Sequence, residues 1–383
     1  MGAWGRGFLG FGRLLVADRR MRMMVGLALA FSFVAVQVYA NLVVTAIPTA
    51  ILDLDQSRVS RALWSSMSAP REVAIAETPA TIDEAWERLA DGRLGAFVVI
   101  PAGLSEDLKK GREAAVLVAV DGANILVGRN AYKALAKAIG QVSAGVQVTT
   151  LRKQGARKDR SVAQAVPIAI DERPIRNPSC NYGVYVAPGI LFFVFHVLVL
   201  LVGLSVFLPG NRPGDAMGVA GAMTAAFLAC TGLGMVLAYA WLRPLSIVPA
   251  SGPGWTLLFV ACLVATDLLA TVAVIGVLKS PLASVEVAIV VGMMSMMLSG
   301  ITWPTDAFPP LLQAFSAYVP FTPFAKGMQV LLHSQSGFDE LSRYLAMFAR
   351  QGTLFAAVAA ASFGLRRGVA ASACRHARPG RPT

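Results

Sequence analysis

The sequence predicts an α-helical polytopic membrane protein with six transmembrane helices and an inserted α/β extracytoplasmic domain. Six apolar stretches of about 20 to 25 residues lie along the 383-residue chain, and at about 1.5 Å per residue each can cross a hydrocarbon core about 30 Å thick. A polar insert, residues 48–183, separates the first stretch from the second. The predicted spans are Met23–Ile47, Val184–Leu208, Gly218–Leu242, Trp255–Leu278, Ser284–Trp303 and Leu345–Leu365.

The placement of charge predicts the topology. The net charge of +12 would indicate nucleic acid in a soluble protein, but here arginines gather in residues 1–22 and in the tail 366–383, beside span ends. Positive residues beside spans mark the cytoplasmic side, so both termini are expected inside and residues 48–183 outside a bacterial inner (cytoplasmic) membrane. We expect no nucleic-acid partner. A cleavable signal peptide ending at Ala40 is the other interpretation of the first span, whose apolar run is long for one.

Segments outside the spans follow recognisable patterns. Residues 1–22, with Gly5–Arg22 mixing apolar residues and arginines, predict an amphipathic helix on the cytoplasmic membrane surface. Residues 304–343 contain two apolar runs too short to span, which predict a re-entrant or interfacial pair outside, and 366–383 form a basic cytoplasmic tail.

The insert alternates short β-branched runs with helical patterns, which predicts a small mixed sheet covered by helices. The expected strands are Ala50–Leu54, Val73–Ala76, Gly95–Ile100, Val116–Val120 and Val166–Ile170. The expected helices are Ser57–Met67, Ile82–Ala90, Leu104–Lys110 and Ala123–Leu151.

Asp53 and Asp55 end the first of these strands and could be taken as a metal-binding pair. The structural interpretation is stronger: Asp55 and Ser57 can accept hydrogen bonds from the free N–H groups of the next helix, and Arg61 can neutralise the acids one turn on. The four cysteines and three histidines show no ligand spacing, so no metal site is predicted.

Asp267 lies near the middle of the fourth span, where a charge costs at least about 2.5 to 3.5 kcal/mol. His196 lies at a similar depth of the second span, and an Asp267–His196 pair would lower that cost and could serve a polar step in transport. The alternative is a neutral Asp267 bonded to Thr266, Thr271 or a backbone carbonyl. Pro188-Gly189 permits a bend near the outer end of the second span.

No Gly-x-x-x-x-Gly-Lys-Ser/Thr loop occurs in the chain, so a motor that uses ATP would be another protein. The chain itself is expected to be no enzyme and to bind no cofactor, with ATP and Mg on a partner ATPase. The short cytoplasmic loops, which contain Arg212, Asp215 and Lys279, are the expected contact with that partner.

Five short motifs occur in one order along the chain. They are Ala50-Ile-Leu-Asp-Leu-Asp-Gln-Ser-Arg-Val-Ser-Arg61, Val99–Leu108 with Val120–Asn124, Asn177-Pro178 with Val186-Ala-Pro-Gly189, Leu298-Ser-Gly-Ile-Thr-Trp-Pro304, and Phe308-Pro-Pro310 with Val319-Pro-Phe-Thr-Pro323. This series resembles permease subunits of type-2 (ABC-2) ABC exporters, in the branch with a large external domain between spans one and two.

The resemblance, over residues 20 to 367, implies a homodimer or a pair of related permeases docked on an ABC ATPase, and in some systems a periplasmic adaptor protein. It implies a substrate path between the paired second and fifth spans. The residues that we expect along a substrate path are Pro188, Gly189, His196, Asp267, Ser299 and Trp303. The acidic-basic stretch that couples many members to the ATPase is shortened here to Pro209–Asp215.

The expected function is therefore ATP-driven export of an amphipathic, drug-like or lipid-linked substrate. The alternative is a membrane-anchored receptor or scaffold whose external domain binds a partner without transport. An intramembrane enzyme is disfavoured, because no nucleophile–base pair or metal set lies at one depth.

Overall fold

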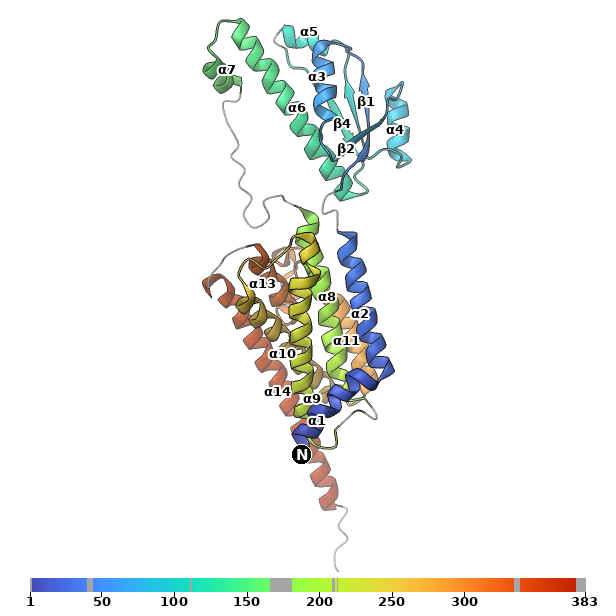
Figure 1. Ribbon diagram of the computed structural model, residues 1–383, viewed down its shortest axis with the longest axis vertical. Helices are drawn as coiled ribbons and strands as arrows, with labels where there is room; N and C mark the ends of the chain where they lie inside the picture. The colour runs from blue at the N-terminus through green and yellow to red at the C-terminus, as the bar shows by residue number, and fades with distance from the viewer. Residues whose placement is uncertain are drawn as a thin grey trace, which may run out of the picture. The chain divides into compact units, whose positions relative to one another are not determined.

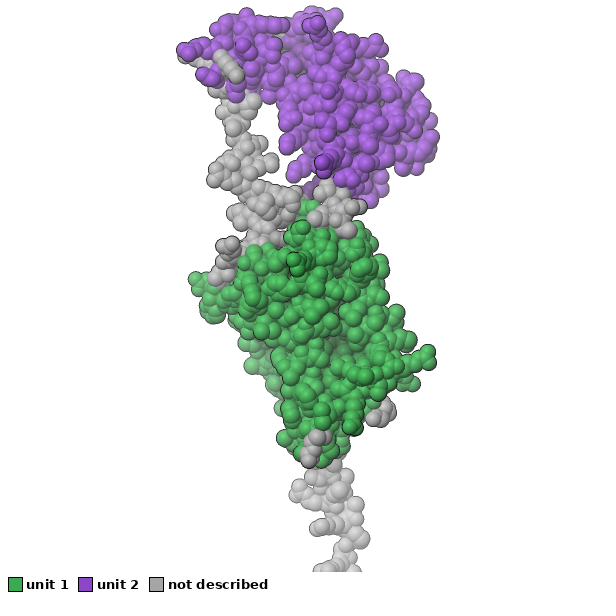
Figure 2. All heavy atoms as spheres, viewed as in Figure 1, with its two compact units in different colours: residues 1–42, 174–383 green, residues 43–173 purple. Residues whose placement is uncertain are grey.

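The computed structural model describes residues 2–39, 44–110, 112–165, 181–208, 211, 213–333 and 338–376. The chain divides into two compact units (Figure 2). One, the membrane unit, comprises residues 1–42 and 174–383, and the other, the inserted unit, comprises residues 43–173. Each unit has its own hydrophobic core, and each is described by itself below.

The membrane unit is a bundle of long apolar helices (Figure 1). Six helical segments among the described residues are long and apolar enough to cross a membrane, which gives a polytopic membrane protein. They are α2 (Arg19–Val38), α8 (Tyr182–Ser205), α9 (Ala216–Val236) with its continuation to Leu245, α10 (Pro253–Leu278), α11 (Pro281–Leu298) and α14 (Phe338–His376). The continuation of α9 is a π-helical turn, Leu237–Trp241, and a 3-10 turn, Arg243–Leu245.

The structure differs from the prediction at both ends of the first predicted span. The single amphipathic helix expected over residues 1–22 is divided into α1 (Ala3–Ala17) and α2. Asp18 makes the break, because its backbone is extended and its carboxylate accepts from Arg20 N and Met21 N as the N-cap of α2. At its other end α2 stops at Val38, whereas the predicted span ran to Ile47, which is instead the first residue of a strand.

Glycine contacts join α1 to α9. Gly7 faces the backbone of Gly218, and Gly221 faces the backbone of Trp4, so closely that a Cβ on either glycine would overlap the facing carbonyl oxygen. Gly7 and Gly221 therefore permit the two backbones to approach. In Figure 1, α1 lies across the end of the bundle at which α9 begins.

The segment predicted as a re-entrant or interfacial pair contains two short helices, α12 (Pro310–Ser316) and α13 (Phe321–His333). The last helix, α14, begins at Phe338, inside the predicted segment 304–343. The side chains of α13 pack into the bundle core, with Phe321 and Phe324 fully buried. The most buried long helix is α8, which contacts α2, α10, α11 and α13.

The inserted unit is a four-stranded mixed sheet with helices on both faces (Figure 1). Its strand order is β2-β1-β3-β4, with β1 parallel to β2 and β3, and β4 antiparallel to β3. The strands are β1 (Ile47–Asp53), β2 (Val73–Glu77), β3 (Ala96–Ile100) and β4 (Leu117–Val120). The helices are α3 (Arg58–Met67), α4 (Ile82–Ala90), α5 (Leu104–Lys109), α6 (Ile125–Lys153) and α7 (Lys158–Ala165). The predicted strand Val166–Ile170 lies outside the described residues.

Alternation along β3 separates the two cores of this unit. Ala96, Val98 and Ile100 pack with α3 and α6, whereas Phe97 and Val99 face the other side with α4. Because successive strand residues point to opposite faces, a strand apolar at every position is one covered on both faces. All five residues of β3 are buried.

Candidate functional site

His196 of α8 and Asp267 of α10 meet inside the membrane unit. His196 Nδ1 lies 2.9 Å from Asp267 Oδ2, and the two side chains are 1% and 0% exposed. The neighbouring hydroxyls bond elsewhere: Thr266 donates to the Cys262 carbonyl and Thr271 to the Leu268 carbonyl. Of the partners that the sequence left open for Asp267, His196 is therefore the one that the structure places within hydrogen-bond distance.

Two atoms of this pair have no hydrogen-bond partner among the described residues: His196 Nε2 and Asp267 Oδ1. A neutral pair shares two protons, and when one of them lies between Nδ1 and Oδ2 and none is on Oδ1, the other is on Nε2. A pair that holds only one proton is a net anion. Burying a net charge in an apolar interior costs much more free energy than burying a neutral pair. In the neutral pair with an unprotonated Oδ1, Nε2 is a hydrogen-bond donor without an acceptor among the described residues.

An aromatic cluster covers the histidine. The Phe321 ring of α13 stacks on His196, with ring centroids 5.4 Å apart. Phe324 stacks on Phe321, and Phe192 and Phe195 of α8 complete a set of fully buried rings. The rings make these surroundings apolar, and a hydrogen bond is electrostatically stronger in apolar surroundings than in water. Sequence reasoning missed Phe321, although Val319-Pro-Phe-Thr-Pro323 was among the motifs noted.

His196 also lines a cavity of about 210 Å³. Thr271, Tyr318 and apolar side chains of α8, α10, α11, α14 and the segment around α12 form the rest of the wall. The apolar lining residues are Leu200, Leu204, Ala270, Val274, Val287, Ala288, Val291, Phe315, Val319, Pro320 and Phe355. This volume is below the usual range of about 300 to 1,000 Å³ for small-molecule sites, so it suits one ring or a short chain of a larger molecule.

The other residues predicted for the substrate path gather away from this pair. Pro188 and Gly189 are buried near the start of α8, and a Cβ on Gly189 would lie 2.6 Å from Ile301 Cδ1. Ser299 is buried and its hydroxyl donates to the Met296 carbonyl, whereas Trp303 is 60% exposed. Gly189 precedes His196 by seven residues, about 10 Å along a helix. The predicted path residues thus form two separate groups.

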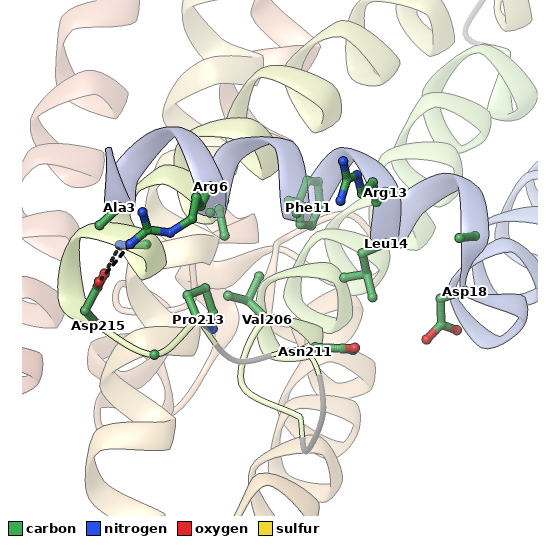
Figure 3. A pocket seen from close by; sticks show the side chains of 16 residues that line it. Ala3, Arg6, Phe11, Arg13, Leu14, Asp18, Val206, Asn211, Pro213 and Asp215 are labelled. Atoms are coloured by element: carbon green, nitrogen blue, oxygen red, sulfur yellow. Dashed lines mark hydrogen bonds and ion pairs between the residues drawn. The ribbon is translucent and has the colours of Figure 1, made fainter. Parts of the chain in front are cut away.

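The residues predicted to contact an ATPase lie at turns. Asp215 caps α9, since its Oδ1 accepts from Gly218 N at 2.6 Å, and its Oδ2 lies 3.9 Å from Arg6 of α1 (Figure 3). Lys279 ends α10 in a left-handed conformation, with φ 63°, and is exposed. Arg212 lies outside the described residues. The ionic link of Asp215 to α1 was not foreseen, because nothing in the sequence places residues 6 and 215 together.

A groove of about 710 Å³ lies between α1 and the start of α9. Its wall includes both members of the Arg6–Asp215 pair together with Arg13, Asp18 and Asn211 (Figure 3). Its exposed charges of both signs distinguish this groove from a mostly apolar small-molecule site.

The acidic motif of the inserted unit is structural, but its bonds differ from the prediction. Ser57 caps α3 and forms a capping box with Ser60. Asp55 instead accepts from Ser105 N in the first turn of α5, and Asp53 accepts from Asp55 N and Gln56 N. Arg61 donates to the Gln56 carbonyl, and no ion pair within the described ranges joins it to either acid.

The pKa of Asp55 lies below its ordinary value. The Ser57 hydroxyl is the main cause; partial burial opposes it, and the N–H groups of Ser105 and Gly103 add to the lowering. Within the part of the chain that the structure describes, no group of three or more His, Cys, Asp or Glu residues could hold a metal ion.

Residues 19–208 match the model of the ABC-2 family transporter proteins. The chain belongs to the ABC-2 transporter family. The matched range runs from the start of α2 through the inserted unit to the end of α8 and so includes His196. The comparisons with curated proteins and with solved structures give no match. This permease is thus a multi-pass membrane component of an ABC transporter, a family whose members pair with an ABC ATPase subunit.

Proposed function

We propose that this chain is the membrane-spanning permease subunit of an ATP-driven ABC exporter. In this proposal it moves an amphipathic, drug-like or lipid-linked substrate outward across the bacterial inner membrane, with ATP hydrolysed by a separate ATPase. The observation that carries the proposal is the His196–Asp267 pair, fully buried beside an apolar cavity in a chain of this family. Ionisable residues inside membrane segments are costly and mark transport pathways more often than they serve packing.

The pair has a defined chemical role in this scheme. The unused Nε2–H of His196 donates a hydrogen bond to a carbonyl, hydroxyl or ether oxygen of the substrate, while the cavity holds an adjoining apolar part. Asp267 fixes the ring and stabilises the proton on it. The pair thereby supplies one polar contact in an otherwise apolar path. Gly189, Ser299 and Trp303 form a second contact site for the substrate near the end of the bundle.

The groove between α1 and α9 is the proposed contact for the ATPase. The Arg6–Asp215 pair and the close glycine contacts make α1 and the start of α9 one packed corner, so a force on one helix is transmitted to the other. With the ATPase contact in the cytoplasm, both termini lie in the cytoplasm and the inserted unit lies outside. The arginine clusters at the two ends of the chain support this orientation.

Pairing with a second permease, identical or related, is part of the proposal. Large apolar side chains of α2 and α11 are exposed in the single chain, among them Leu27, Phe31, Met293 and Met297. In a membrane such a surface meets either lipid or another helix bundle. A periplasmic adaptor would bind the inserted unit.

The test is export by proteoliposomes that contain the permease and its ABC ATPase. Export should require both chains and ATP, and the purified permease alone should turn over no ATP. Asp215→Asn keeps a good N-cap for α9 but removes the charge, so it should weaken association with the ATPase without loss of folding. Glu340→Gln, at the opposite end of the bundle, is the matched control. ATP turnover by the permease alone would contradict the proposal.

The receptor alternative draws on the inserted unit, which has two cores of its own and can serve as a binding module. It predicts no ATP-dependent substrate movement under any of these conditions and no effect of Asp215→Asn on partner binding by the inserted unit.

A further inference from the structure

Lys326 is a half-buried cation within the bundle. It lies on α13 between residues that are almost completely buried, including Phe324, Ala325 and Met328. A lysine that reaches headgroups from a lipid-facing surface has exposed apolar neighbours on its helix. Lys326 has buried neighbours instead, so its ammonium lies in a cavity formed by protein rather than on an open lipid-facing surface.

Among the described residues, the ammonium of Lys326 has one hydrogen-bond partner. Its Nζ donates to Thr305 Oγ1 at 2.5 Å, and no carboxylate in the described part of the chain is within ion-pair distance. Thr305 Oγ1 in turn lies 3.4 Å from Asp306 Oδ1, so that acid is linked to the lysine only through the hydroxyl. An ammonium has three N–H donors, and two of them remain for a ligand.

Lys326 lines a cavity of about 160 Å³. Gln329, one turn along α13, also lines it and uses its amide Nε2 to donate to the Tyr185 carbonyl at 2.8 Å. The Tyr185 hydroxyl donates to the Gly300 carbonyl at 3.2 Å, which fixes the turn after α11 against α8. Since a water occupies about 30 Å³ of liquid, the cavity has room for a group of several heavy atoms.

The cavity lies close to the ends of membrane helices. Tyr185 is in the first turn of α8, and Ser299 directly follows α11. Exposed Tyr182 and Trp303 belong to the same end, and such aromatic residues are typical of the headgroup level of a bilayer.

We infer that this cavity binds the anionic group of an amphiphile, a phosphate ester or a carboxylate, with Lys326 as its counter-charge and Gln329 as a second donor. Charge-assisted hydrogen bonds of this kind are about twice as strong as neutral ones. The inference needs only that the chain lies in a membrane, so it stands or falls separately from the transport function proposed above.

The competing explanation is structural, with Lys326 serving only to hold the turn after α11 through Thr305. Thr305→Val separates the two, because it removes the hydroxyl, preserves the side-chain shape and leaves the charge of Lys326 in place. Lys137→Gln removes an exposed lysine of α6 in the inserted unit and is the control for net charge.

The experiment is native mass spectrometry of the purified full chain with dioleoyl phosphatidylglycerol, compared with zwitterionic dioleoyl phosphatidylcholine. Lys326→Gln should lower retention of the anionic lipid by about tenfold, which corresponds to about 1.4 kcal/mol. Lys326→Arg, Thr305→Val and Lys137→Gln should retain it. With the unmodified chain, retention of the anionic lipid alone should fall as ionic strength rises.

Glycerol phosphate as a competitor distinguishes the source of the anion. Displacement of the lipid at matched concentration would assign the site to a soluble phosphate ester, and failure to displace it would assign the site to an amphiphile. Equal retention by the unmodified chain and Lys326→Gln would overturn the inference. So would an equal loss in Thr305→Val, or anionic-lipid retention that is insensitive to salt.

Discussion

The backbone of Gly7 in α1 lies directly against the backbone of Gly218 in α9, with no space for a side chain between them. Such contact fixes one helix on another without any hydrophobic side chain at the crossing. It also makes the corner between α1 and α9 sensitive to a single added carbon.

Gly7→Val is therefore expected to displace α1 from α9. Overpacking of this kind costs about 1 to 3 kcal/mol, and it should lower the thermal stability of the purified chain and the yield of co-purified ATPase together. Gly12→Ala is the matched control, because a Cβ at residue 12 meets nothing within 4 Å. Equal behaviour of the two variants would show that the glycine contact contributes nothing.

Breaking the buried pair should stop export. Asp267→Asn removes the acid that holds the His196 ring, and His196→Ala removes the ring, so each should lower export by at least about tenfold, which corresponds to about 1.4 kcal/mol. Because both act on one unit, the double variant should be little worse than either single one. Export assays in proteoliposomes measure all three.

Thr266→Val is the control for that experiment, since the Thr266 hydroxyl bonds the Cys262 carbonyl and not Asp267. It should export normally. Normal export by both Asp267→Asn and His196→Ala would remove the pair from the transport path.

Acid should selectively loosen the start of α5. The lowered pKa of Asp55 means that its ionised form stabilises the fold. This contribution is complete above the ordinary aspartate pKa of about 3.9 and is lost as the pH falls through the lower pKa of the folded state. Thermal unfolding of the full chain at stepped pH should show less acid destabilisation in Asp55→Asn. The same acid slope in both proteins would refute the assignment.

Labelling tests the topology with exposed positions in the two units. In a background without the native cysteines, Glu87→Cys should react with a membrane-impermeant maleimide in intact cells, whereas Lys279→Cys should react only after the membrane is opened. The reverse pattern would invert the proposed orientation.

The sequence predicts the elements of this chain better than their contacts. Hydropathy and β-branched runs locate the membrane helices and strands β1 to β4, because each signal is local. The sequence did not predict the boundary at Asp18. A single acidic residue within an apolar–basic pattern is compatible with a continuous helix, and only the structure shows that Asp18 caps α2. The approach of His196 to Asp267 was one of several options, since depth along a helix is readable from sequence but the direction of a side chain around it is not. Arg6–Asp215 and Phe321 on His196 depend wholly on the tertiary fold.

The enclosure of α8 has a consequence for how this protein responds to its membrane. Residues of α2 and α14 are mostly open to the surroundings, whereas most of α8 is covered by other helices. A change in bilayer thickness acts on helices that touch lipid, through tilt and local deformation. Such mismatch is therefore absorbed by α2 and α14, and the depth of His196 is set by protein packing. The polar pair should accordingly behave alike in thin and thick bilayers.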